Sequence, residues 1–233
     1  MARSSAILAF PALLLVLGTA SSLSAQSGRA NYIAPDIASG YYLSYPINSV
    51  ASGVVVVAVD LDSAGRVKKT EVLRDIPSLT APLLLAIEKW TFKPAVLRGK
   101  AVDSTIVVNI LYNANDYRLG SAKAPVLGKE LKMLTPDAAG FMPPKIVAAA
   151  WAEYPLNSVA QGSVILDARI GTLGHVSQVT PVWKNQSLTT TSMNAAKAWT
   201  FHPARLDGEA IAANTVVGYV FRLPNTASPL AHP

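Results

Sequence analysis

The chain contains an internal repeat with a constant spacing of 109 residues. Residues 45–53, YPINSVASG, recur as residues 154–162, YPLNSVAQG, and residues 90–95, WTFKPA, recur as residues 199–204, WTFHPA. A spacing that holds from the beginning of a unit to its end indicates two copies of one folding unit, because chance motifs would not stay in phase. Positions that both copies share report what the fold requires.

The N-terminal segment has the pattern of a secretory signal peptide. Arg3 precedes an apolar run from Ala6 to Leu17, and small residues follow up to Ala25. The run is shorter than the ~20 residues that a membrane span needs. We therefore expect a cleaved signal and an exported protein, with an uncleaved anchor as the alternative. The predicted organisation is a signal peptide (1–25), a first domain with its lead-in (26–116), a linker (117–143), a second domain (144–224) and a tail (225–233).

The composition excludes several kinds of chemistry. There is no cysteine, so disulfides and thiolate metal sites are absent. The formal net charge of +6 favours acidic partners such as anionic membrane surfaces or cell-wall polymers. The basic residues are scattered and not interleaved with stacking aromatics, which makes nucleic acid an unsuitable partner. We interpret the charge as a solvated surface.

Each copy has the pattern of a β-β-α-β unit. In the first copy, a valine-rich strand from Gly53 to Leu61 leads through a turn ending at Gly65 into a second strand from Arg66 to Arg74. Comparison with the second copy, where polar and apolar residues alternate, places a single apolar face in the core; its members are Val55, Val57, Val59 and Leu61. The prediction is an α+β fold of two tandem units, each a three-stranded antiparallel sheet with one helix on one face.

The helix of each unit follows the hairpin. In the first copy Ser78 or Thr80 is the expected N-cap. The expected core positions have helical spacing and are Leu79, Leu83, Ile87 and Trp90. The second helix has a threonine-rich beginning and fewer apolar contacts, so we expect tertiary packing to hold it. Third strands are expected over about 102–112 and 211–221.

The first copy resembles the C-terminal domain of the TonB energy-transducer family. The resemblance rests on the order and spacing of Tyr45-Pro46, Gly53, the turn Gly65-Arg66-Val67, the run WTFKPA at residues 90–95, Gly99 and the strand at residues 106–112. It extends over about seventy residues, and the second copy is similar at the same places with more changes. The resemblance implies a periplasmic module of a Gram-negative envelope that binds another protein; if the signal were not cleaved, it would be an inner-membrane anchor.

The resemblance also implies a binding site. In TonB proteins the third strand is an exposed edge that accepts an extended peptide from an outer-membrane transporter. Transferred to this chain, the partner-binding edge strand consists of Ile106, Val107, Val108, Asn109, Ile110, Leu111 and Tyr112, with residues 216–221 as its counterpart. The expected partner is an envelope protein or peptide, such as a TonB-dependent outer-membrane receptor. The sequence lacks the N-terminal motor-docking helix and proline-rich spacer of TonB proteins, so we do not expect it to transmit force.

The reactive side chains do not form a site for catalysis, a cofactor or a metal. The three histidines, His175, His202 and His232, have no counterparts in the first copy and no zinc-binding spacing. Trp90 and Trp199 recur together with a phenylalanine two residues later, which favours packing over ligand stacking. We therefore expect no enzyme. Two alternatives to partner binding stay open: a structural module whose strand edges pair within the chain or between two chains, and attachment to the cell wall.

Overall fold

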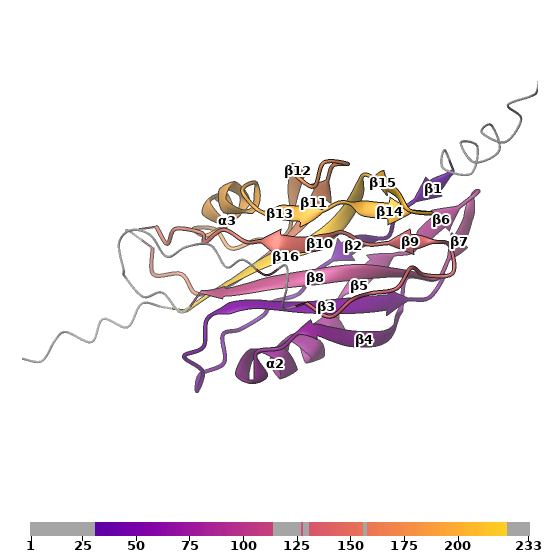
Figure 1. Ribbon diagram of the computed structural model, residues 1–233. Helices are drawn as coiled ribbons and strands as arrows, with labels where there is room; N and C mark the ends of the chain where they lie inside the picture. Colours follow the sequence, from indigo (N-terminus) through magenta and orange to yellow (C-terminus); the bar gives the residue numbers. More distant parts are fainter. Residues whose placement is uncertain (1–30, 114–126, 128–130, 156–157, 223–233) are drawn as a thin grey trace, which may run out of the picture.

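The computed structural model describes residues 31–113, 127, 131–155 and 158–222 (Figure 1). These residues form mostly β-strands with two α-helices, which confirms the predicted α+β class. The predicted signal peptide and tail lie outside the described residues. No helix in the described part of the chain has the length and apolar character needed to cross a membrane.

The two halves repeat the same order of elements. The first half contains β1 (Tyr32–Ile33), β2 (Asp36–Ser39), β3 (Gly53–Leu61), β4 (Val67–Arg74), α2 (Pro77–Ile87), β5 (Thr91–Lys93), β6 (Ala95–Leu97), β7 (Lys100–Val102) and β8 (Ser104–Asn113). The second contains β9 (Phe141–Met142), β10 (Lys145–Ala148), β11 (Gly162–Ile170), β12 (Val176–Trp183), α3 (Thr189–Ala196), β13 (Thr200–His202), β14 (Ala204–Leu206), β15 (Glu209–Ile211) and β16 (Ala213–Phe221). Every strand of the second half begins 109 residues after its counterpart. The repeat seen in the sequence is therefore a repeat of structure.

The two sets of long strands join into one six-stranded sheet. Its order is β12-β11-β16-β8-β3-β4. Within each half the strands pair antiparallel, as predicted, but β16 and β8 pair with each other in parallel. The expectation of two separate three-stranded sheets is wrong, because pairing satisfies the backbone groups that each third strand would otherwise leave open.

Parallel pairing places the two helices on opposite faces of the sheet (Figure 1). The strand order reads the same from either edge, with β12, β11 and β16 matching β4, β3 and β8, so an approximate two-fold axis along the strands relates the halves. Accordingly, Leu79 and Leu83 of α2 pack with the odd-numbered residues of β3, while Leu188 and Ala196 at α3 lie in the other core cluster. One helix covers each face of a shared sheet.

Both faces of the first strand are buried. Val55, Val57, Val59 and Leu61 lie in the core under α2, as predicted. Val54, Val56 and Ala58, which the alternation assigned to the opposite face, are also buried and belong to the cluster that includes α3. The prediction of a single buried face is wrong because the other half covers the second face.

Each lead-in packs on the other half. In the first lead-in, the Leu43 amide donates to Ser163 Oγ of β11 at 2.9 Å. In the second, the Lys132 amide donates to the Leu73 carbonyl of β4 at 3.2 Å, and Leu131 is buried against the first half. Among its described residues, the predicted linker therefore includes the buried Leu131 and strand β9, which pairs with β14 of the second half.

A threonine fixes the beginning of each helix. The N-cap of α2 is Ile76, with no side-chain cap, so neither Ser78 nor Thr80 is the N-cap that we expected. Instead Thr80 Oγ1 accepts a hydrogen bond from the Ile76 amide at 3.1 Å. Its counterpart Thr189 accepts from the Asn185 amide at 2.9 Å. Retention of this threonine in both copies thus has a local structural cause.

The hairpin turn of each half requires glycine. Gly65 and Gly174 have φ of 78° and 82°, and a Cβ at either position would collide with the backbone carbonyl of Phe92 or Phe201. The turn therefore lies directly against β5 or β13. This contact connects the hairpin to the segment that follows the helix.

Candidate functional site

The predicted partner-binding strand lies in the centre of the sheet. Residues Ile106–Tyr112 belong to β8, which pairs with β3 on one side and β16 on the other. All seven residues are buried, with at most 2% of the surface of each exposed. The expectation of an open edge is wrong, and the same holds for residues 216–221 in β16. In this conformation β8 can accept a peptide only if it separates from β16.

Side chains reinforce the parallel joint. Asn109 Nδ2 donates to Thr215 Oγ1 and to the Val216 carbonyl, both at 3.1 Å. The Thr215 hydroxyl donates to the Val107 carbonyl at 2.8 Å. On the helix side, the Tyr112 hydroxyl donates to the Leu79 carbonyl at 3.2 Å. Of the side chains predicted to bind a partner, Asn109 thus helps to hold the two halves together, and Tyr112 anchors α2 within the first half.

The outer strands of the sheet are β4 and β12. The Leu73 carbonyl points away from β3, because it accepts the Lys132 amide. Asp62 donates its amide to the Arg66 carbonyl across the hairpin, so the even-numbered residues of β3 face β4, and Glu71 and Lys69, opposite Ala58 and Asp60, face β3. The N–H and C=O groups of Thr70 and Val72 therefore point outward, and a bulge at Leu73 turns its carbonyl outward as well. Among the described residues, the segment that contains Lys132 reaches only the end of β4 where Leu73 lies. The other end is the candidate site for an added strand.

A groove of about 620 Å³ lies beside this end of β4. One wall is the turn and strand from Ala64 to Thr70, and the other is Glu88 together with Trp90, Thr91 and Phe92. The first wall follows from the glycine turn that presses against Phe92, and the second from the end of α2. An extended segment that paired with β4 would lie along the first wall.

Charged residues order the turn that begins the groove. Asp62 Oδ1 accepts the amides of Ala64 and Arg66 at 2.9 Å. These bonds, the Arg66 amide above all, hold the pKa of Asp62 below its ordinary value. Lys68 Nζ donates to Asp103 Oδ2 at 2.7 Å, which raises the pKa of Lys68. Asp62 and Asp103 thus serve the turn.

The two outer edges differ in chemistry. Arg66, Lys68 and Lys69 border the groove at β4, whereas the corresponding residues at β12 are His175, Ser177 and Gln178. Strand β12 also contains Pro181, a residue typical of edge strands because it lacks an amide donor. Only the first half therefore has a basic edge.

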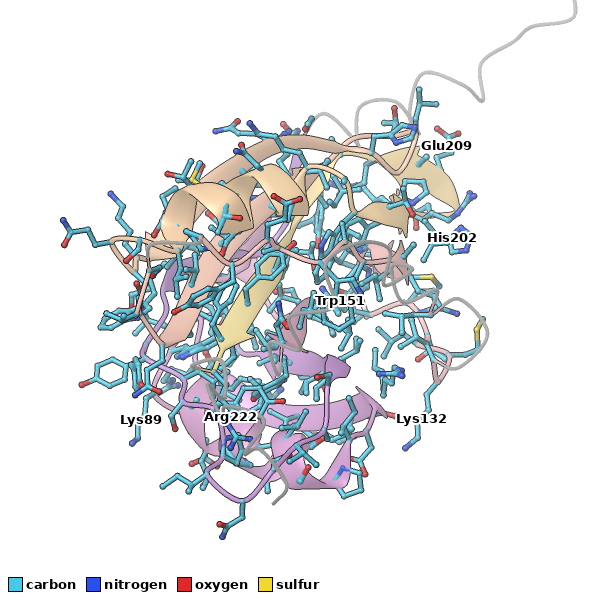
Figure 2. The ribbon with its side chains drawn as sticks, turned by 90° about the vertical axis from the view of Figure 1, so that its left-hand side faces the viewer. Lys89, Lys132, Trp151, His202, Glu209 and Arg222 are labelled. Carbon is cyan, nitrogen blue, oxygen red and sulfur yellow. The ribbon has the colours of Figure 1, made fainter. Side chains whose placement is uncertain are left out.

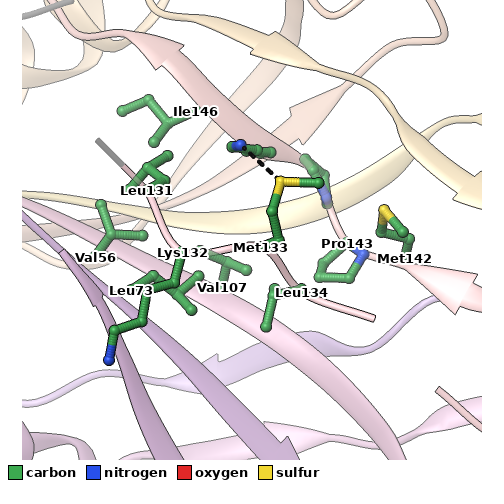
Figure 3. Close-up of a pocket in the computed structure, with 12 residues that line it drawn as sticks. Val56, Leu73, Val107, Leu131, Lys132, Met133, Leu134, Met142, Pro143 and Ile146 are labelled. Atoms are coloured by element: carbon green, nitrogen blue, oxygen red, sulfur yellow. Dashed lines mark hydrogen bonds between the residues drawn. The ribbon is translucent and has the colours of Figure 1, made fainter. Parts of the chain in front are cut away.

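A second, smaller cavity lies where the connector crosses the first half (Figure 3). It measures about 40 Å³ and is lined mainly by apolar residues, among them Val56, Leu73, Leu131 and Ile146. Lys145 Nζ donates to Met133 Sδ at 3.6 Å near its rim. A volume close to that of one water molecule in the liquid indicates a packing gap and no site for an organic ligand.

Two carboxyl groups from different halves, Asp36 in β2 and Asp167 in β11, meet at Asn214 of β16. Asn214 Nδ2 donates to Asp167 Oδ2 at 2.9 Å and to Asp36 Oδ1 at 3.2 Å. Lys93 Nζ donates to Asp36 Oδ2 at 2.9 Å. Burial, followed by the neighbouring Asp36 carboxylate, raises the pKa of Asp167 to about 7. These side chains form a polar contact between the two halves, and the charge of this contact depends on pH.

The aromatic residues shared by the two copies pack in the core. Trp90, Phe92, Trp199 and Phe201 are all buried, which agrees with the packing interpretation. In the second half Trp199 Nε1 donates to Tyr219 Oη at 2.6 Å and to the Ala150 carbonyl at 3.2 Å. In the first half Trp90 Nε1 has no partner among the described residues, and Ile110 stands in the place of Tyr219. Within the described ranges, no group of three His, Cys, Asp or Glu residues could hold a metal ion.

A signal for the central position of β8 is present in the sequence. Residues 106–112 read IVVNILY, an almost continuous apolar run that is typical of a strand buried on both faces, as parallel strands are. An edge strand with one solvated face would show alternation instead. The lysines of β4 are the residues that the resemblance did not identify.

The comparisons with known proteins agree with part of this description. Residues 42–114 match the family model described as Gram-negative bacterial TonB protein C-terminal. No curated protein matches the chain. The family match covers β3, β4, α2 and β5 to β8 and does not extend into the second half. Over residues 42–114 the first half is therefore similar to the C-terminal domain of Gram-negative TonB proteins.

Proposed function

We propose that this protein is a periplasmic module that binds an extended segment of an envelope protein by adding it as a strand to β4. The family match supports a role beside outer-membrane transport, with a TonB-dependent receptor as one class of partner. The observation that carries the proposal is the outward-facing backbone of β4 next to a groove of about 620 Å³. Binding, and not catalysis, is the function, and the second half is a further copy of the same domain.

The position of the site follows from the pairing of the halves. Because β8 and β16 use each other's backbone groups, the edge that the family resemblance implies is no longer open. Strand addition needs an unpaired edge with room for side chains beside it. The described part of the chain offers both at residues 67–71, and the Leu73 end is taken by Lys132.

Photo-crosslinking in intact cells tests this site. A photoreactive residue replaces Glu88, which is exposed on the wall opposite β4. We expect crosslinks to an envelope protein, identified by mass spectrometry. Thr70→Pro removes an outward N–H and should abolish the crosslinks, because a proline ring blocks pairing. Val179→Pro makes the same change at the equivalent position of β12 and should leave them intact.

Two results would contradict the proposal. One is loss of crosslinks in both proline variants while circular dichroism shows that both are folded, and the other is their persistence in Thr70→Pro. A structural role is the second candidate function, favoured by the parallel pairing of β8 with β16 within the chain. A structural role predicts that the photoreactive residue at position 88 crosslinks to no partner, even in the protein without a proline substitution.

A further inference from the structure

The loops that begin the two long hairpins are more alike than the rest of the repeat. We call residues 45–53 and 154–162 the tyrosine-proline loops. In their first seven positions, six residues are identical between the copies. Over the following positions, 52–113 against 161–222, only 18 of 62 are identical. A constraint stronger than that on the average position therefore acts on these loops.

Folding explains part of this identity. The Tyr45 hydroxyl donates to the Ala51 carbonyl, and the Tyr154 hydroxyl donates to the Ala160 carbonyl at 2.8 Å. Each loop also has a serine that accepts the amide two residues later, at 3.2 Å for Ser49 and 3.1 Å for Ser158. These bonds account for the tyrosines, the serines and the turn.

Folding does not explain the apolar residues at the tips. Val50 is 83% exposed and its counterpart Val159 is 85% exposed. Ile47, in the same loop as Val50, is 91% exposed. An exposed valine that packs on nothing has no role in the stability of the monomer, and exposed apolar groups that cluster mark interaction sites. Retention in both copies indicates that both tips are used.

The sheet brings the two loops to one end of the molecule. Gly53 is opposite Tyr112 at the end of β8, and Gly162 is opposite Phe221 at the end of β16. Since β8 and β16 are parallel, both loops lie at the end where these strands finish. Arg222 Nη1 donates to the Ser49 carbonyl at 3.0 Å, so the second half holds the first loop. Figure 2 faces this end of the molecule and labels Arg222.

We propose that these two tips insert into the surface of an anionic lipid membrane. The approximate two-fold axis that relates the halves runs along the strands. A flat surface perpendicular to this axis would therefore contact both loops in equivalent ways. A lipid surface offers such a plane, whereas an asymmetric protein partner would present different groups to the two valines. Neither loop contains a charged residue, which suits insertion among headgroups. The formal net charge of +6 attracts the chain to anionic lipid.

Vesicle binding tests this inference independently of the groove at β4. The full chain is purified from the periplasmic fraction and sedimented with vesicles of phosphatidylglycerol and phosphatidylethanolamine, or with neutral phosphatidylcholine. The test variant is Val50→Asp with Val159→Asp, which changes only exposed side chains. The control is Leu173→Asp, since Leu173 is 84% exposed in the turn at the opposite end of β11.

The expected result is binding to anionic vesicles that weakens on the order of ten-fold in the double variant and is unchanged in Leu173→Asp. All variants share the same N-terminal segment, so its own affinity for lipid cancels in the comparison. Equal binding of the double variant and the wild type would overturn the inference. Absence of vesicle binding by the wild type would overturn the inference too. This includes the outcome in which the wild type does not bind vesicles and analytical sedimentation shows that the valine tips join two copies of the chain.

Discussion

Asn109 in the first half donates a hydrogen bond to the hydroxyl of Thr215 in the second, at 3.1 Å, across the only parallel strand pair of the six-stranded sheet. Both residues are buried. The strand that the family resemblance assigns to a partner is thereby committed to the other half of the same chain. Substitutions at this joint should therefore have coupled effects on the free energy of unfolding.

The Asn109–Thr215 bond predicts coupled stability effects. We expect Asn109→Ala and Thr215→Val each to destabilise the protein, and the double variant to cost less than their sum by about 0.5–1.5 kcal/mol. Urea unfolding of the four proteins measures this coupling. Thr215→Val combined with Ser39→Ala, which affects a separate bond to Thr91, should be additive. Additivity of Asn109→Ala with Thr215→Val would show that the joint does not form.

Because the two central strands approach each other closely, replacing Gly218 with a larger residue should destabilise the protein. A Cβ there would overlap Ile110 Cδ1 and lie 3.0 Å from Ile165 Cδ1, and both isoleucines are buried. Gly218→Ala should therefore lower the free energy of unfolding by about 1–2 kcal/mol. Gly171→Ala adds the same atom where the nearest contact is an ordinary 3.7 Å, and it should change stability by less than ~0.5 kcal/mol. Equal effects in the two variants would refute close packing at the joint.

The two repeated tryptophans should differ in their contributions. Trp199→Phe leaves Tyr219 and the Ala150 carbonyl without the indole donor, whereas Trp90→Phe removes a donor that has no partner among the described residues. Because losing a made hydrogen bond costs more than losing an unmade one, Trp199→Phe should destabilise by ~1 kcal/mol more than Trp90→Phe. Chemical denaturation of the two variants provides the comparison. A larger loss in Trp90→Phe would contradict the assigned hydrogen bonds.

The carboxyl pair between the halves predicts a dependence of stability on pH. The folded pKa of Asp167 is about 7, above its ordinary 3.8, so the native state binds the proton more tightly than the unfolded state. Stability is therefore highest below pH 4 for this group and falls as pH rises toward 7. After allowance for partial exposure, the loss is on the order of 1–2 kcal/mol.

Asp167→Asn isolates this contribution. The amide cannot ionise, so the variant should lack the decline between pH 4 and pH 7 and should exceed the wild type in stability at pH 8. Urea unfolding at several pH values measures both curves. Parallel curves for the two proteins would mean that Asp167 does not titrate in this range.

Local features of the fold could be predicted from the sequence. The repeat spacing, the hairpins, the helix with buried Leu79, Leu83 and Ile87, and the packed tryptophans all follow from patterns within one half. Each depends on interactions between residues close in sequence, which periodicity and turn chemistry report directly.

The relation between the halves could not be predicted in the same way. Strand order depends on pairing over about a hundred residues, and neither half contains a local signal for its neighbour. Two hints are nevertheless present: residues 54–59 are apolar on both faces, and β8 lacks alternation. The candidate groove at β4 was missed because family resemblance directed attention to the third strand.

Amide hydrogen exchange along β8 tests the central claim most directly. If β8 lies between β3 and β16, consecutive amides from Val108 to Tyr112 are all hydrogen-bonded and should all exchange slowly. If β8 were an open edge, every second amide would face solvent, so fast exchange at alternate residues would contradict the account.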